Sequence, residues 1–451
     1  MVAVAMLAGC NVERNGTPIP EISAVFEKTR PIVTQTSAPL PSRTVMPVPT
    51  QTPVPAITAD LSGFPPRIDK NMKPSLDIGI VSVANERYVY YYEVVDEEIK
   101  EGQDTYIYSH DDLYRMDRKT EKSVKIGRTK TEVLIEKIFL DKKGGLYYLA
   151  ADEDFVMSIY KWEPDEDSIV IQDVLEILRI DEDAIFYISS KGINDPNICC
   201  MVMRYELGNG NVSKVTSLMN ESSHYSMKNS PYLIYTIPDT ADEGSPQQIY
   251  SLNLEDGTVS KLAHTKGEIT VTDDGCNLIV CELSGDVLSY EIYDFTLMKK
   301  HSFALSLDYQ KAYPSLVYGG NLYLVDNNED EVQNISKSNI YVFDINTGAH
   351  VNTVPTSYIK KSHLYNENWY LYTYTQKGHP EHNPTLTKQR ISVFDLKTNR
   401  VSIIPVKLAD KAYDDDQDYT FEVAGDFIWM VSFYYTASSN NCWQKIGISS
   451  R

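Results

Sequence analysis

The chain has 451 residues, 42% of them apolar, and a formal net charge of −21. That apolar fraction can build a core, which excludes global disorder, and the acidic balance argues against nucleic acid as a partner. The charge is unevenly spread: residues 1–70 hold 11 of the 22 Pro, no Tyr, and 6 Lys and Arg against 5 Asp and Glu. Residues 71–451 therefore carry a charge of −22 and all 32 Tyr.

The N-terminus is a short apolar run that ends in Leu7-Ala8-Gly9-Cys10. Small residues before a cysteine resemble the lipobox of bacterial lipoproteins, whose signal peptide is cut before a cysteine that carries a diacylglycerol. The resemblance implies a signal peptide over 1–9, lipidation of Cys10, and a lipid-anchored protein on the extracytoplasmic face of the cell membrane. No Lys or Arg precedes the run, which indicates a truncated signal peptide. The alternative is an ordinary apolar N-terminus with a chance cysteine.

Residues 10–70 follow as a linker rich in Pro and Thr. Proline fixes φ and removes backbone donors, so neither a helix nor a sheet can grow in this segment. Such a linker is a disordered, semi-rigid tether that extends by about 3 Å per residue. No stretch of 18 apolar residues occurs elsewhere, so we expect the lipid to be the only contact with the membrane.

From about residue 77 the chain repeats two kinds of hairpin. In the first, a tight turn of Gly, Asn or Asp precedes an aromatic strand, as in 143–149 and 319–325. In the second, a strand such as Ile249-Tyr250-Ser251-Leu252 leads through a turn to a more polar strand. The second kind recurs at a mean spacing of about 46 residues, which is the size of one four-stranded β-propeller blade.

The repeat predicts an all-β domain over 71–451, a β-propeller of four-stranded blades. Eight first hairpins and seven complete second hairpins favour eight blades, with seven as the alternative. The last unit, ending at 442–448, lacks its fourth strand, and residues 55–62 could supply it to close the ring.

The aromatic strand 146–150, the acidic loop after it and Ser158-Ile159-Tyr160-Lys161-Trp162 resemble bacterial propellers of unknown function related to the Tol-system and low-density-lipoprotein-receptor propellers. The Tyr-Trp-Thr-Asp signature of the receptor propellers is absent, and the Tol-type Ser-Pro-Asp-Gly turn survives only loosely, as Thr272-Asp273-Asp274-Gly275. The resemblance implies a fold and an extracytoplasmic setting, and it implies no activity.

Acidic clusters gather at connections that a propeller places on one face. These are the loops between second and third strands and the loops between blades. The candidate acidic binding rim consists of Glu97, Glu98, Asp152, Asp154, Asp242, Glu243, Glu329, Asp330, Asp414, Asp415 and Asp416. Converging carboxylates suit a cationic partner or Ca²⁺, but no calcium-binding loop motif occurs, and solvated surface loops are the alternative.

No catalytic residues are assigned. Hydrolase, nucleotide-binding and zinc-protease motifs are absent. His379-Pro380-Glu381-His382 is a dense cluster of potential ligands, but nothing near it in the sequence completes a zinc site, so no metal or other cofactor is expected. Cys276 and Cys281 are expected to be buried free thiols rather than a strained bridge.

The sequence thus favours a non-enzymatic module. We expect a monomer, displayed on the cell surface, that binds or scaffolds a protein, peptide or glycan of the cell envelope. The alternative is a propeller lyase or glycosidase with carboxylates near its central channel.

Overall fold

The chain divides into two units, 1–59 and 60–451, and every residue described below belongs to the second. The computed structural model describes residues 78–448 except 102–103, 130–133, 152–155, 165–166, 190–197, 220–222, 228–229, 241–244, 295, 298, 331–334, 366, 376–387, 405–417 and 434–441. The predicted signal peptide, Cys10 and the linker lie outside these residues. Within them, no helix has the length and apolar character that crossing a membrane requires.

The described residues form antiparallel sheets in chain order. The first contains β2 to β5 (Ser82–Ala84, Tyr88–Glu101, Asp104–Asp117 and Ser123–Arg128). The second contains β1 (Ile78–Gly79) and β6 to β9 (Leu134–Leu140, Leu146–Ala151, Met157–Lys161 and Ser168–Ile171). The third contains β10 to β13 (Val174–Ile180, Ala184–Ser189, Ile198–Glu206 and Val212–Met219). The fourth contains β14 to β17 (Ser223–Ser226, Tyr232–Pro238, Gln247–Asn253 and Val259–Thr265).

The remaining strands form three further sheets, again in chain order. The fifth sheet contains β18 to β21 (Glu268–Val271, Leu278–Ser284, Val287–Tyr293 and Lys299–Ser306), and a 3-10 helix, η2 (Leu307–Tyr309), comes after it. A seven-stranded sheet contains β22 to β28 (Tyr313–Tyr318, Asn321–Asp330, Ile335–Asp344, His350–Tyr365, Asn368–Thr375, Lys388–Asp395 and Arg400–Ile404). The last sheet has three strands, β29 to β31 (Asp418–Ala424, Phe427–Phe433 and Cys442–Gly447).

Local sequence explains the hairpins. The turns between first and second strands hold residues with positive φ, such as Gly144, Gly320 and Asp426, which tight hairpins require. The aromatic second strands that follow are buried, and rings such as Tyr148 and Tyr323 are fully enclosed. They pack between neighbouring strands and sheets, as the sequence predicted.

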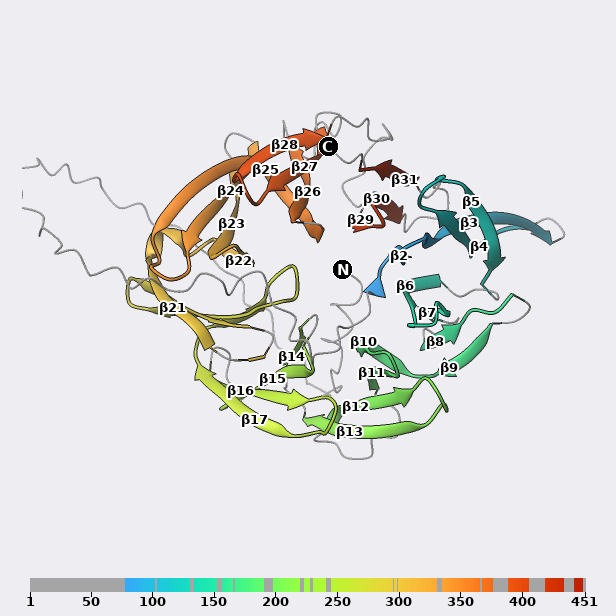
Figure 1. The fold of residues 1–451 in the computed structure, drawn as a ribbon, viewed down its shortest axis with the longest axis horizontal. Helices are drawn as coiled ribbons and strands as arrows, with labels where there is room; N and C mark the ends of the chain where they lie inside the picture. Colours follow the sequence, from blue (N-terminus) through green and yellow to red (C-terminus); the bar gives the residue numbers. More distant parts are fainter. Residues whose placement is uncertain are drawn as a thin grey trace, which may run out of the picture. The chain divides into compact units, whose positions relative to one another are not determined.

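The sheets succeed one another around a common centre, with β10, β14 and β22 on the inside and β13, β17 and β21 on the outside (Figure 1). Radial succession of four-stranded antiparallel sheets is the architecture of a β-propeller. The all-β prediction is confirmed, and the succession of sheets is consistent with the predicted β-propeller. In the seven-stranded sheet, β25 pairs with β24 through residues 350–357 and with β26 through residues 358–365.

The first and last sheets meet at a buried carboxylate. Glu422, on the inner strand β29, is 7% exposed and accepts hydrogen bonds from three successive backbone N–H groups: those of Ile80 (3.2 Å), Val81 (3.0 Å) and Ser82 (3.1 Å). The Tyr92 hydroxyl donates to the carbonyl of Ile80 at 3.2 Å. These bonds fix the segment between β1 and β2, which belong to different sheets.

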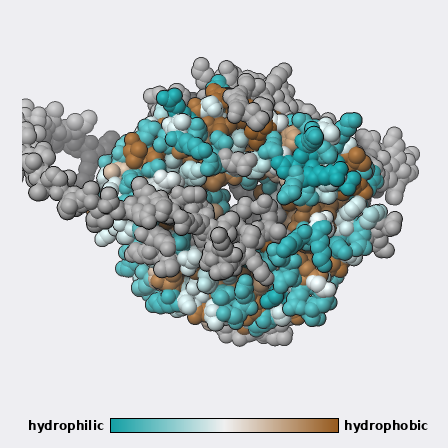
Figure 2. All heavy atoms as spheres, viewed as in Figure 1, coloured by the Kyte–Doolittle hydropathy of each residue, from teal (hydrophilic) through white to brown (hydrophobic). Residues whose placement is uncertain are grey.

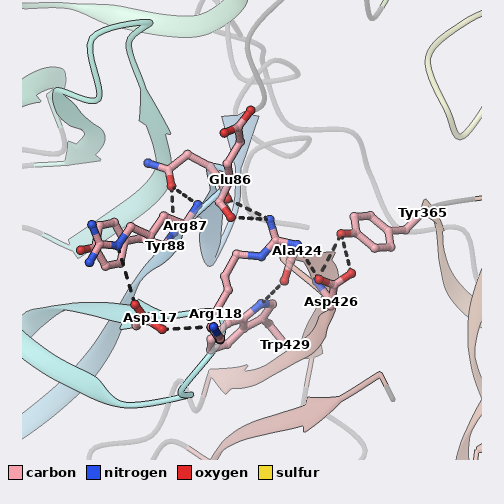
Figure 3. Close-up of polar contacts among 11 residues, drawn as sticks. Glu86, Arg87, Tyr88, Asp117, Arg118, Tyr365, Ala424, Asp426 and Trp429 are labelled. Carbon is pink, nitrogen blue, oxygen red and sulfur yellow. Dashed lines mark hydrogen bonds and ion pairs between the residues drawn. The ribbon is translucent and has the colours of Figure 1, made fainter. Parts of the chain in front are cut away.

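A second contact joins the same sheets at the turns (Figure 3). The Arg118 guanidinium, after β4, forms an ion pair with Asp426 in the turn between β29 and β30 and donates to the carbonyl of Asn85 at 3.0 Å. The Tyr365 hydroxyl, at the end of β25, donates to the other oxygen of Asp426 at 3.2 Å. Side chains therefore tie three sheets together here. The predicted closing strand, 55–62, lies outside the described residues.

Candidate functional site

The structure describes part of the predicted acidic rim. Asp152, Asp154, Asp242, Glu243 and Asp414 to Asp416 lie outside the described residues, as does the 379–382 cluster. Glu97 and Glu98 lie within β3, opposite Tyr108 and Ile107 of β4. Glu329 and Asp330 lie in β23, opposite Ser336 and Ile335 of β24. For these four residues the structure describes only the backbone.

Those positions were expected to be loops, and the structure makes them strands. The connections between second and third strands are long hairpins, β3–β4 and β23–β24. In each, the two strands keep pairing with each other beyond the residues that also pair with a neighbouring strand. The β3–β4 hairpin projects away from the other sheets (Figure 1). The carboxylate-bearing residues of these hairpins therefore lie on arms.

A second group of polar residues lies at the inner strands, where three segments meet. Asp273 follows β18, in the turn 272–277 that leads to β19. Its backbone N–H donates to the carbonyl of Ser315 on β22 at 2.7 Å, and the hydroxyl of Ser362 on β25 donates to its carboxylate. The turn thus contacts two inner strands that come later in the chain.

The two adjacent aspartates of this turn have different roles. The Asp274 carboxylate accepts bonds from the Thr272 hydroxyl (2.5 Å) and the Cys276 N–H (3.0 Å), while Gly275 has φ 69°. Asp274 therefore shapes the turn. Asp273 is exposed, and one oxygen of its carboxylate accepts a hydrogen bond from the Ser362 hydroxyl.

β-Bulges in the inner strands help to build this site. Ser315 is the extra residue between the pairs Pro314–Leu324 and Leu316–Tyr323, so its carbonyl is available to the Asp273 N–H. Lys360 occupies the corresponding irregularity in β25 and is exposed. Bulges re-aim groups of a strand that would otherwise pair within the sheet.

Electrostatics mark Asp273 as unusual for an accessible carboxylate. Desolvation by the surrounding protein raises its pKa from 3.8 to about 6, the Ser362 hydroxyl lowers it, and the charge of Asp274 raises it. Tyr313, at the start of β22, is 42% exposed. Burial and, second, the charge of Asp273 raise the pKa of its hydroxyl to about 12. The charge of Tyr358 also contributes.

A more deeply buried acidic pair lies on β4. Asp111 is fully buried and accepts a bond from the Ile135 N–H at 2.6 Å, and desolvation raises its pKa to about 8. Asp112 next to it forms ion pairs with Lys125 and Arg128. Because one carboxylate is enclosed and the other is already paired with two cations, this pair supports the packing of β4 against its neighbours.

Metal binding finds no support among the described residues, since no three His, Cys, Asp or Glu side chains there are grouped to hold an ion. Cys276 and Cys281 form no disulfide among the described residues, and both are half-buried where buried thiols were predicted. The turn 272–275 is visible in the sequence, but its contacts are not, because Ser315 and Ser362 lie 42 and 89 residues away from Asp273. On the face drawn in Figure 2, hydrophilic residues cover much of the described surface and apolar residues form small patches.

Comparison with known proteins finds distant structural neighbours and leaves the function open. No family model and no curated protein matches the chain. Among solved structures, the β-propeller domain of the Trilobed protease from Pyrococcus furiosus is 12% identical, with a TM-score of 0.42, and the match covers 73% of this chain and 97% of that one. Oligopeptidase B from Leishmania major is 12% identical, with a TM-score of 0.47 and coverage of 81% and 54%. TolB from Acinetobacter baumannii is 14% identical, with a TM-score of 0.29 and coverage of 69% and 79%. The chain spans about half the length of the oligopeptidase, and none of these similarities assigns an activity.

Proposed function

We propose that the chain is a lipid-anchored β-propeller on the cell surface, which binds a protein, peptide or glycan of the envelope without catalysing a reaction. The lipobox-like sequence ending at Cys10 and the Pro-rich linker support the anchor and the display. The observation that carries the binding role is the pair of long hairpins, β3–β4 and β23–β24, which bear acidic residues on arms.

We also propose eight blades. The double pairing of β25 supports this count, since it divides the seven-stranded sheet into a β22–β25 half and a β25–β28 half. The other sheets each supply one unit, and the three strands β29 to β31 form the last.

The anchor is tested by cell fractionation. Wild-type protein should be found with the membrane and should incorporate a labelled fatty acid, while Cys10→Ala should do neither. A variant that still incorporates the label would refute lipidation at Cys10.

The binding role is tested with envelope components immobilised by class: peptidoglycan fragments, surface glycans and surface proteins. We expect one class of component to retain the wild type and to retain less of the double variant Glu97→Gln/Glu98→Gln, because the β3–β4 hairpin of this variant carries less negative charge. The matched control is Asp183→Asn/Glu255→Gln, which removes two exposed charges from other turns. Equal retention of both double variants would refute a role for this arm.

The alternative, a lyase or glycosidase, keeps one supporting observation: Asp273 is an accessible carboxylate whose pKa of about 6 suits general acid–base work. Turnover of an envelope glycan by the wild type and its loss in Asp273→Asn would favour the enzyme. Absence of turnover together with intact binding favours the module.

A further inference from the structure

We infer that the site around Asp273, where the turn after β18 meets the inner strands β22 and β25, binds an organic cation: an ammonium or guanidinium group carried by a ligand. This inference goes beyond the proposed function, because the hairpin arms take no part in it and it stands if they bind nothing.

The Asp273 carboxylate has a hydrogen-bond donor and no ion-pair partner among the described residues. One oxygen of Asp273 accepts the Ser362 hydroxyl, and no cationic side chain among the described residues forms an ion pair with it. Asp273 is exposed to solvent, so a ligand can approach this residue. A carboxylate without a countercharge gains Coulomb energy from a cation that a ligand brings.

The neighbouring aromatic ring is that of Tyr313. Tyr313 is 42% exposed although it lies on an inner strand. It is two residues from Ser315, whose carbonyl accepts the Asp273 N–H. An organic cation between a carboxylate and an accessible tyrosine ring gains both the Coulomb attraction and a cation–π contact. A small inorganic cation would instead require several oxygen ligands, and no three His, Cys, Asp or Glu side chains of the described residues are grouped to hold one.

The electrostatic field of the acidic domain also favours a cationic ligand. Residues 71–451 carry a net charge of −22, which concentrates cations near the protein. The backbone of the site is fixed before any ligand arrives, because the Asp274 carboxylate holds the turn and the Asp273 N–H is bonded to Ser315. Little ordering is therefore required on binding.

The experiment is a titration of the full chain by calorimetry with three probes: trilysine amide, spermidine and Ca²⁺. Binding of trilysine amide or spermidine should weaken about tenfold or more in Asp273→Asn. The matched control, Asp256→Asn, removes one exposed carboxylate from the turn between β16 and β17 and should bind as the wild type does. Preference for the peptide over spermidine would identify the source of the cation as a basic segment, and the reverse preference a free polyamine.

The aromatic contact has its own variants. Tyr313→Phe keeps the ring and should bind normally, whereas Tyr313→Ala should bind less tightly. Unchanged melting temperatures of the Asp273 and Tyr313 variants separate loss of the site from loss of the fold. Binding that survives Asp273→Asn, binding of Ca²⁺ alone, or no binding of either organic cation by the wild type overturns the inference.

The dependence on pH gives a further readout. Affinity of the wild type should fall as the pH drops through about 6, because protonation removes the charge of Asp273, and the profile of Asp273→Asn should be flatter. Other titratable groups on the surrounding segments are common to both proteins and cancel in the comparison: Asp274, Tyr313, Tyr358, Lys360, Lys361 and His363. Failure of this test leaves the retention assay on the hairpin arms unaffected.

Discussion

Replacement of Glu422 by Gln tests how the first and last sheets are held together. The carboxylate is buried and accepts three backbone N–H bonds at 3.0–3.2 Å. Desolvation nevertheless raises its pKa from 4.5 to about 7, against the lowering effect of those bonds. The folded protein therefore holds the proton more tightly than the unfolded chain does.

The sign and size of the effect of pH on stability follow from this difference in pKa. A carboxyl group whose pKa is higher in the folded state stabilises the fold fully below pH 4.5, and this contribution is lost as the pH rises to about 7. The shift of about 2.5 units corresponds to about 3 kcal/mol. Glutamine does not titrate, so the stability of the wild type relative to Glu422→Gln should fall by about 3 kcal/mol between pH 4.5 and pH 8.

The assay is urea denaturation of both proteins across this pH range, with native-state hydrogen exchange of the Ile80, Val81 and Ser82 amides as a local readout. All other titrating groups are shared, so only the difference between the two proteins counts. Glu255→Gln, at an exposed position, should track the wild type. Parallel profiles for wild type and Glu422→Gln, or a difference that grows in favour of the wild type with rising pH, would refute this account.

Two more substitutions test packing and the turn contact. Gly267→Ala should destabilise by about 3 kcal/mol in urea denaturation, because the new Cβ would lie 1.9 Å from the Cys281 carbonyl oxygen. Gly208→Ala meets no atom within 4 Å and should stay within about 0.5 kcal/mol, so equal effects would contradict the geometry. Arg118→Ala should cost about 1 kcal/mol, and high salt should reduce that loss, because its ion pair with Asp426 is partly exposed; a loss independent of salt would mean that packing dominates.

The hairpins were predictable from sequence because their causes are local. Turn residues with positive φ and alternating aromatic strands recur with a regular spacing, and the structure confirms them at turns such as 143–145 and 319–320. The acidic stretches at 97–98 and 329–330 were placed at the right connections. They were assigned to loops because the sequence does not show that β3 and β4 keep pairing beyond the sheet.

The amino-acid sequence by itself determined that this protein is all-β, built from a four-stranded repeat, and divided into a near-neutral N-terminal region and a strongly acidic domain. Only the tertiary structure decided that Glu422 holds residues 80–82 and that Asp273 meets Ser315 and Ser362. The physical reason is range: a turn or a strand is encoded within a few residues, whereas these contacts join segments up to 342 residues apart. They depend on how successive sheets meet around the centre and on which inner strands are bulged, and neither leaves a periodic mark in the sequence.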